Sequence, residues 1–280
     1  MKQNDDTIQN FDRPDYVMKE KISALLQTEW AGNTLYCFKV TDSTNDAAAR
    51  LAKKNAPHGT LIVADSQESG KGRRGRAWKT PPGTSIAMSL IVRPSLHPAC
   101  ASMMTLVMGM AAAASIREMC GVDAHIKWPN DVVADGKKIC GILTEMSCRA
   151  DAIDYVVTGI GINANVEDFP SELSEKAVSL RQLTGREIDR ASLIALCMEK
   201  LEYYYGRFVE TQDMSLLKDE YNQFLAGRNH TVRVMDPVNE YSGISLGIND
   251  RGELMVEKED GTVRNVYAGE VSVRGIYGYV

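Results

Sequence analysis

The chain has 280 residues, of which 32 are lysine or arginine and 37 are aspartate or glutamate, so its formal net charge is −5. Hydrophobic residues make up 44% of the chain and charged residues 25%. This ordinary globular composition argues against a disordered chain, a collagen-like repeat and a disulfide scaffold. The length suffices for one large domain with its own core and a second, small one.

Cysteine spacing and the apolar segments narrow the class further. The six cysteines, at positions 37, 100, 120, 140, 148 and 197, form no CxxC pair and lack metal-ligand spacing with the histidines. We therefore expect reduced thiols in a cytoplasmic protein. The N-terminus is polar and acidic, without the apolar region of a secretory signal. The longest uncharged, mostly apolar stretch, 99–116, is shorter than the about 20 residues of a membrane span and predicts a buried helix.

In chain order, residues 1–15 are expected to form a flexible arm and 16–27 a short helix. These residues are too few for a helix-turn-helix domain of roughly 50 residues, so no DNA binding is expected. Strands are predicted over 35–40, 60–65, 85–92 and 155–163, and helices over 43–55 and 101–120. Residues 131–145 predict a hairpin around Asp135-Gly136. Strands mixed with helices indicate an α+β fold with a mixed sheet.

The second half changes character twice. Residues 165–190 are polar with only one weak helical piece, and loops of that length are often functional lids. Apolar residues then recur at helical spacing from Leu193 to Phe208, and a further helix is predicted over 216–225. Short strands over 232–235, 243–247, 254–258, 263–267 and 271–276 predict a small β-barrel. The expected division is 1–30 for the arm and short helix, 31–226 for the large domain and 227–280 for the barrel.

Positive charge is concentrated in one segment. Residues 69–117 contain no aspartate or glutamate, but they contain Lys71, Arg73, Arg74, Arg76, Lys79, Arg93 and Arg117. The glycines at 70, 72 and 75 formally match a dinucleotide fingerprint, yet Pro81-Pro82-Gly83 cannot open the helix that should follow, and the acidic ribose ligand is missing. We expect a flexible loop whose amides and cations hold an anion. A solvated basic loop or a nucleic-acid patch is the alternative.

The hairpin contributes a second group of cations. A two-residue turn at 135–136 pairs Ala134 with Lys137 and Val133 with Lys138, which places Lys138 on the face of Cys140 and Ile142. A lysine drawn into a dry site must meet an anion. Two solvated lysines beside a turn are the alternative.

Two further short segments, 43–46 and 159–165, carry local patterns. Residues 43–46 fit a capping box in which the Ser43 hydroxyl binds the Asp46 amide. The glycines of 159–165 permit either close approach of a ligand or a tight strand crossing.

Together, these segments resemble the bacterial biotin protein ligases. The family's order and spacing are found in Ser43-Thr44-Asn45, in the GKGRRGRxW sequence of 70–78 after Gln67, in KWPND at 127–131, in GKKICGILTE at 136–145 and in GIGIN at 159–163. Residues 269–274 resemble the end of the family's SH3-like C-terminal domain. The resemblance extends over roughly residues 33–280, and the basic loop together with KWPND is its most specific part.

The resemblance implies a biotin/lipoate ligase-like catalytic domain followed by an SH3-like domain, as in the monofunctional class without a DNA-binding domain. In that family, biotin's carboxylate attacks the α-phosphate of ATP to give biotinyl-5′-AMP and pyrophosphate. A lysine on the biotin carboxyl carrier domain of a biotin-dependent carboxylase then attacks the mixed anhydride. Cations in a dry site, with Mg²⁺ on the phosphates, help both anions to meet. A homodimer and no membrane association are further expectations.

The same resemblance assigns the site residues. Biotin is expected to be held by Ser43, Thr44, Asn45, Gln67, Gly70, Lys71, Gly72, Arg73 and Lys138. ATP and the adenylate are expected at Arg76, Trp78, Lys127, Asn130, Asp131 and Asn163. The catalytic role is expected of Lys138, Arg73 and Lys127, and no metal site made of protein ligands alone is expected. Lys71 stands where the best-known sequences have arginine, so charge is kept but bidentate geometry is lost.

Two other functions remain open from the sequence. A lipoate–protein ligase or octanoyltransferase would share the catalytic fold but handle another acyl group. A non-catalytic, nucleic-acid-binding module would use the basic loop. The net charge of −5 and the sparse aromatics near the loop argue against the second.

Overall fold

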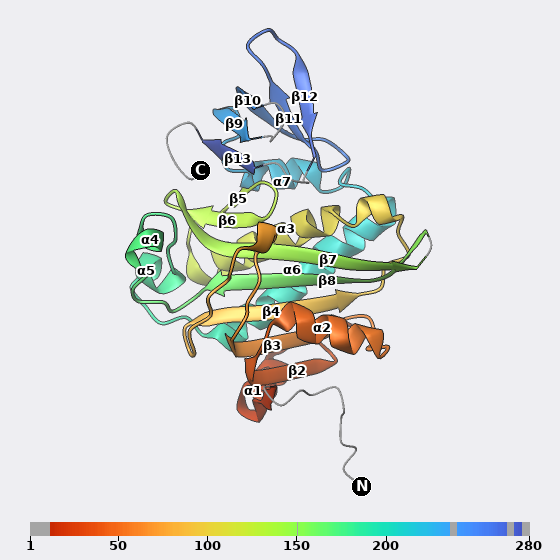
Figure 1. Cartoon of the computed structure of the whole chain (residues 1–280), viewed down its shortest axis with the longest axis vertical. Helices are drawn as coiled ribbons and strands as arrows, with labels where there is room; N and C mark the ends of the chain where they lie inside the picture. The colour runs from red at the N-terminus through yellow and green to blue at the C-terminus, as the bar shows by residue number, and fades with distance from the viewer. Residues whose placement is uncertain (1–11, 150, 236–239, 268–271, 276–280) are drawn as a thin grey trace.

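A computed structural model describes residues 12–149, 151–235, 240–267 and 272–275. Two sheets organise these residues (Figure 1). The larger sheet has eight strands in the order β1-β2-β3-β4-β8-β7-β6-β5. Their bounds are Arg13–Pro14, Leu35–Thr41, Thr60–Gln67, Ser85–Val92, Ala152–Asn163, Lys137–Arg149, Asp131–Ala134 and His125–Lys127, respectively.

Helices cover both faces of the larger sheet. Figure 1 shows α2 (Thr44–Lys53) in front of the sheet, and α3 (Met103–Cys120) and α6 (Arg190–Thr211) behind it. The alternation along the central strands follows this division: Ile62 and Ile91 pack in the cluster with α2, whereas Leu61 and Leu90 pack in the larger core with α3 and α6. Because both faces are covered, these strands are near-continuous apolar runs, and β4 is buried at every position.

The apolar stretch 99–116, predicted as a buried helix, lies mostly within helix α3. The helical segment Pro98–Cys120 is the single stretch in the described part of the chain that is long and apolar enough to cross a membrane, and 72% of its apolar window is buried inside the protein. Gly109 faces the sheet, where even a Cβ would make ordinary contact, 3.7 Å from the Ile126 and Ile142 side chains. The helix ends at Gly121, which has a φ of 67°.

The C-terminal strands form a separate five-stranded antiparallel sheet in the order β12-β11-β10-β9-β13. It packs on the larger domain, where Trp128 Nε1 donates a hydrogen bond to the Gly252 carbonyl at 3.0 Å. Helix α7 (Lys218–Phe224) leads into it. The bounds are Val263–Val266, Leu254–Glu257, Tyr241–Ile248, Thr231–Met235 and Ser272–Gly275, respectively. The predicted strands are confirmed, although 269–271 of the terminal motif and residue 276 lie outside the described residues.

The flexible arm predicted for residues 1–15 is wrong from residue 12 onward. Asp12 is only 5% exposed and forms an ion pair with Arg50, and β1 extends the sheet by pairing with β2. Composition could not predict this order because the partners of Asp12 and β1 lie 24 or more residues away in the chain. Helix α1 (Tyr16–Leu25) follows as predicted, and residues 1–11 lie outside the described part.

The segment 165–190 is more structured than its polar composition predicted. It contains two short helices, α4 (Ser171–Ser174) and α5 (Leu180–Thr184), rather than one weak helical piece. Helix α5 begins with a capping box in which Ser179 and Gln182 exchange hydrogen bonds. Val178 N–H donates to the Lys138 carbonyl at 3.0 Å, so the segment is hydrogen-bonded to the start of β7.

Candidate active site

The Ser43–Asn45 segment lies at the start of α2, but not as a capping box. Ser43 is the N-cap residue, yet its side chain makes no capping hydrogen bond. Instead, Asp42 Oδ1 accepts from the Ser43 N–H at 2.6 Å, and Gln67 Oε1 at the end of β3 accepts from the Thr44 N–H at 2.9 Å. The capping-box interpretation is therefore wrong: the Ser43 side chain makes no capping bond, and Asp42 rather than Asp46 accepts from the Ser43 amide.

Asn45 has an orientation that its neighbours dictate. Its Nδ2 donates to Glu145 at 2.6 Å and to the Leu143 carbonyl at 3.3 Å, while its Oδ1 accepts from Ser89 at 2.7 Å. A carboxylate only accepts hydrogen bonds, so the amide nitrogen must face Glu145. Gly159 makes this possible, since a Cβ there would lie 2.1 Å from Asn45 Oδ1. The glycines of β8 thus admit site side chains closely.

The basic loop folds back on itself and leads into β4 without a regular helix. Trp78 N–H donates to the Gly70 carbonyl at 2.8 Å, and Gly72 N–H donates to the Arg76 carbonyl at 2.7 Å. A single 3₁₀ turn, Arg73–Gly75, forms its tip. Gly70 is required here, because a Cβ would lie 2.3 Å from the Trp78 carbonyl oxygen.

Two loop cations anchor the loop to its surroundings. Lys71 Nζ lies 2.5 Å from Asp46 Oδ1 on α2. Arg73 Nη1 donates to Asn130 Oδ1 at 2.7 Å. Burial lowers the pKa of the Arg73 guanidinium, although the nearby Asp131 opposes this. The loop therefore faces the protein, bridging α2 and the 127–131 segment.

Lys138 is placed on the opposite face of β7 from the one predicted. The pairs Ala134–Lys137 and Val133–Lys138 are confirmed, but the register shifts between Val132 and Val133, so Val132 pairs with Cys140. This β-bulge adds one residue and reverses the alternation beyond it. Cys140 and Ile142 turn to the core, whereas the end of the Lys138 side chain lies over Gly141.

The ammonium of Lys138 meets an anion of the protein itself. Its Nζ lies 2.6 Å from Asp131 Oδ1 and 5.4 Å from the centre of the Trp78 ring. The Trp78 ring packs closely on two strand glycines: a Cβ at Gly161 of β8 would lie 2.3 Å from its Cε2, and one at Gly141 of β7 would lie 3.2 Å from its Cζ3. The alternative of two solvated turn lysines is therefore wrong for Lys138. Lys137 reaches the Ser174 carbonyl at 2.9 Å.

These side chains line two connected cavities. A narrow pocket lies between α2, the basic loop and the glycines of β7 and β8, and contains Ser43, Thr44, Asn45, Gln67, Lys71, Gly72, Arg73 and Lys138. A wider cavity of about 490 Å³ contains Arg73, Arg76, Trp78, Lys127, Asn130, Asp131, Lys138 and Asn163. Lys138 and Arg73 line both. Gly70 lines a third cavity of about 960 Å³, which lies between the basic loop, the N-terminal end of α3 and β7.

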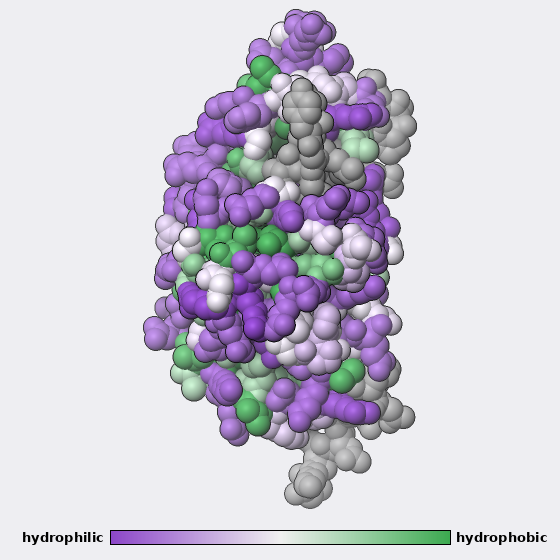
Figure 2. All heavy atoms as spheres, turned by 90° about the vertical axis from the view of Figure 1, so that its left-hand side faces the viewer, coloured by the Kyte–Doolittle hydropathy of each residue, from purple (hydrophilic) through white to green (hydrophobic). Residues whose placement is uncertain are grey.

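The wider cavity has a wall that the residue patterns did not reveal. Residues 166–177, including Phe169, Leu173 and Lys176, line it together with Val273 of the C-terminal sheet. Figure 2 shows an apolar area framed by hydrophilic side chains on this side of the molecule, at the height of α4 in Figure 1. The only sequence signal was the length of the 165–190 segment. Ser89, which helps to orient Asn45, gave none, and Glu145 stood at the end of the GKKICGILTE motif without an assigned role.

Other chemistry is limited. The described residues contain no group of three or more His, Cys, Asp or Glu side chains that could hold a metal ion. All six cysteines are free, and burial raises the pKa of the Cys37 and Cys197 thiols to about 12. The described residues therefore offer no cluster for a metal ion, and Cys37 and Cys197 are poor thiolate nucleophiles.

The amino-acid sequence matches two known protein families and several characterised ligases. Residues 37–163 match the biotin/lipoate A/B protein ligase family, and 229–274 match the biotin protein ligase C-terminal domain. The chain is 37% identical to a bifunctional ligase/repressor of Bacillus subtilis over 266 residues, covering 93% of this chain and 80% of that protein. It is 32% identical to a biotin–[acetyl-CoA-carboxylase] ligase of Mycobacterium tuberculosis, covering 82% of this chain and 85% of that protein.

Solved structures of biotin protein ligases share the fold of this chain. The biotin protein ligase of Aquifex aeolicus in complex with biotin and ATP superposes with a TM-score of 0.76 and 28% identity, covering 87% of this chain and 99% of that one. The two family models cover much of the mixed sheet, residues 37–163, and most of the C-terminal sheet, residues 229–274. The chain therefore belongs to the biotin protein ligase family.

Proposed function

We propose that this protein activates biotin with ATP and transfers it to a lysine of a biotin carboxyl carrier domain. The observation that carries the proposal is the position of Lys138, which lines both the narrow pocket and the wider cavity. A carboxylate bound in the first and a phosphate bound in the second would meet at its ammonium. Support comes from the relatives named as biotin ligases and from the Aquifex complex with biotin and ATP.

The narrow pocket suits the head group of biotin. We assign the ureido ring to the closed end, where Ser43, Thr44 and Gln67 supply polar atoms around a small buried space. Asn45 forms the wall beside them, with both hydrogens of its amide engaged by Glu145 and Leu143. Gly70, Lys71 and Gly72 of the loop close over this end.

The wider cavity suits the nucleotide. Lys127 is only 9% exposed, and Arg76, Asn130 and Asn163 supply further polar groups around the same space. We assign these groups, together with Asp131 and the Trp78 ring, to ATP and then to the adenylate. Apolar side chains from 166–177 offer a surface for the base.

In the first step, a biotin carboxylate oxygen attacks the α-phosphorus, the new O–P bond forms, and the bond to pyrophosphate breaks. Negative charge increases on the phosphoryl oxygens, and preorganised cations stabilise it because they need not reorient. Lys138 and Arg73 are placed for this role at the junction, and Lys127 in the cavity. We propose that Lys138 then exchanges Asp131 for the developing acyl phosphate.

In the second step, the amine of the acceptor lysine attacks the acyl carbon, an amide forms, a proton is lost and AMP leaves. The mixed anhydride hydrolyses in water, so the site must exclude water until the acceptor arrives. The basic loop is held over the junction by Arg73–Asn130 and Lys71–Asp46. We propose that it acts as the lid over the intermediate.

Mg²⁺ would be bound chiefly through the nucleotide phosphates, where it would neutralise part of their charge. No side-chain cluster of the described residues suits a metal ion by itself. We assign none of them to Mg²⁺.

Three further assignments complete the proposal. We place the domain boundaries at 30/31 and 226/227, supported at the second by the end of α7 at Phe224 and the start of β9 at Thr231. The free cysteines support a cytoplasmic location. A homodimer remains a proposal, tested by sedimentation with and without biotin.

The test is incubation with biotin, ATP, Mg²⁺ and a carrier domain. We expect a mass gain of one biotinyl group on the acceptor lysine. An unchanged acceptor would refute the proposal. A thermal shift with lipoate but not with biotin would favour the lipoate ligase. Steeply salt-dependent binding of a polynucleotide would favour the nucleic-acid-binding module.

A further inference from the structure

The first strand of the sheet brings Asp12 next to the end of β2, where it contacts Thr41 and Arg50. Strand β1 places Arg13 opposite Val40 and Pro14 opposite Phe38, and the Asp15 N–H donates to the Cys37 carbonyl at 2.8 Å. Asp12, directly before β1, is 5% exposed. Its carboxylate therefore occupies a defined place beside the end of β2.

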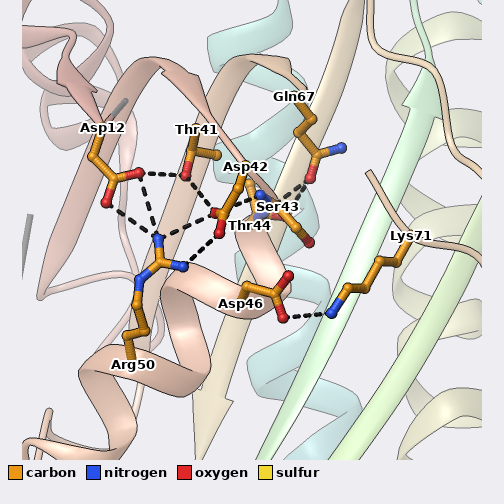
Figure 3. Close-up of polar contacts among 9 residues, drawn as sticks. All are labelled: Asp12, Thr41, Asp42, Ser43, Thr44, Asp46, Arg50, Gln67 and Lys71. Carbon is orange, nitrogen blue, oxygen red and sulfur yellow. Dashed lines mark hydrogen bonds and ion pairs between the residues drawn. The ribbon is translucent and has the colours of Figure 1, made fainter. Parts of the chain in front are cut away.

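Asp12 belongs to a network centred on Arg50 of α2 (Figure 3). Arg50 Nη2 lies 3.2 Å from Asp12 Oδ2, and Arg50 Nη1 lies 2.6 Å from Asp42 Oδ2. Thr41 Oγ1 donates to Asp12 Oδ1 at 2.5 Å. Figure 3 shows the guanidinium between the two carboxylates. Attraction and hydrogen bonds within the network outweigh burial, so the pKa of Asp42 is lowered and that of Arg50 is raised.

The network continues into the pocket lining. Asp42 Oδ1 accepts both from Arg50 Nη2 at 3.1 Å and from the Ser43 N–H at 2.6 Å. The next amide, that of Thr44, donates to Gln67. The backbone at 43–44 is thus held by two side chains: Asp42 binds the Ser43 amide, and Gln67 binds the Thr44 amide.

We propose that Asp12 is a positioning residue for biotin binding: by holding Arg50 and Thr41 it fixes Asp42, and through Asp42 the Ser43–Thr44 corner of the pocket. It acts without touching the ligand. The inference rests on the proposed function, because it takes biotin as the occupant of the narrow pocket. Binding and positioning are reciprocal, so biotin must in turn hold the segment at Asp12–Asp15 more firmly.

The experiment uses the full chain and steady-state pyrophosphate release. Loss of a charged, buried hydrogen-bond acceptor in Asp12→Ala is expected to raise KM for biotin about tenfold, while kcat and KM for ATP change less than about twofold. Asp12→Asn keeps an acceptor for Thr41 but loses the charge, and it should lie between wild type and Asp12→Ala. The control is Asp154→Ala, which likewise removes a carboxylate paired with arginine, in this case Arg93 and Arg149. That variant should leave KM for biotin unchanged.

A second readout does not depend on turnover. Hydrogen exchange at the Asp15 amide, followed with and without biotin, should slow on binding in the wild type and lose that response in Asp12→Asn. A folded Asp12→Ala with unchanged KM for biotin would overturn the inference, as would a wild-type Asp15 amide indifferent to biotin. If Asp12→Ala does not fold, Asp12→Asn and the exchange data decide. Failure of the wild type to release pyrophosphate would instead overturn the proposed function.

Discussion

Lys138 and Asp131 meet across the β6–β7 hairpin, with Nζ 2.6 Å from Oδ1, even though Asp131 is paired in the ladder with Gly141. The bulge and the bare backbone of Gly141 let the lysine cross to this side. A partly buried ammonium thereby has a partner before any substrate arrives. An incoming carboxylate can replace Asp131 without leaving the charge unpaired at any stage.

Lys138→Ala is expected to slow adenylate formation severely while the fold remains intact. The variant removes the cation at the junction of the two cavities, and loss of one such preorganised group costs on the order of 10²–10³ in rate. Pyrophosphate release measures it, and circular dichroism checks the fold. Lys137→Ala is the matched control, since that neighbour reaches the Ser174 carbonyl outside the junction. Release at the wild-type rate in Lys138→Ala would show that this lysine merely flanks the turn.

Arg73→Gly is expected to let biotinyl-5′-AMP escape faster and to label bystander proteins. The change removes the hydrogen bond to Asn130 that ties the loop to the 127–131 segment, and it frees the backbone as well. Release of the adenylate and biotin on added bystander protein measure the effect. Arg73→Lys keeps the positive charge but loses the bidentate guanidinium, so its effect should lie between those of wild type and Arg73→Gly. Labelling confined to the acceptor lysine in Arg73→Gly would contradict the role of the loop as a lid.

Gly161→Ala is expected to displace Trp78 and to weaken both stability and ligand binding. The added Cβ would lie 2.3 Å from Trp78 Cε2, a distance that neither group can accommodate in place. Overpacking of this kind costs about 1–3 kcal/mol. Thermal unfolding and indole fluorescence report the change. Gly206→Ala is the control, because a Cβ there meets nothing within 4 Å and removal of a helix glycine should stabilise slightly. Equal Tm in Gly161→Ala and wild type would contradict the packing argument.

Acid is expected to remove the stabilising contribution of Asp42. Burial alone raises the pKa of this carboxyl, but hydrogen bonds from Arg50, Ser43 and Thr41 outweigh it and hold the pKa below its ordinary value of 3.8. A lowered folded-state pKa contributes stability that is present above the unfolded value and lost as pH falls through the folded one. The Tm difference between wild type and Asp42→Asn should thus be large near neutral pH and shrink below about pH 4. A difference independent of pH would contradict this assignment.

The elements, and the chemical groups that line the two cavities, could be predicted from the sequence because the signals are local. Apolar runs such as Ser85–Val92, the Asp135-Gly136 turn and the Gly121 helix end each require only neighbouring residues. The charge of the basic loop and its glycines likewise stand within a few positions of one another. The family motifs then ordered these pieces.

The tertiary structure alone decided how the pieces meet. Composition could not place Asp12, because its partner Arg50 is 38 residues away and the sheet edge holds it in reach. Strict alternation predicted the wrong face for Lys138, because a single bulge reverses every side chain beyond it.

The same limit applies to Ser89 and Glu145, which orient Asn45 from two other strands. Local pattern thus determined what each segment is and which groups it carries. Long-range pairing, which no local signal encodes, determined which of those groups share a cavity and which charge faces which.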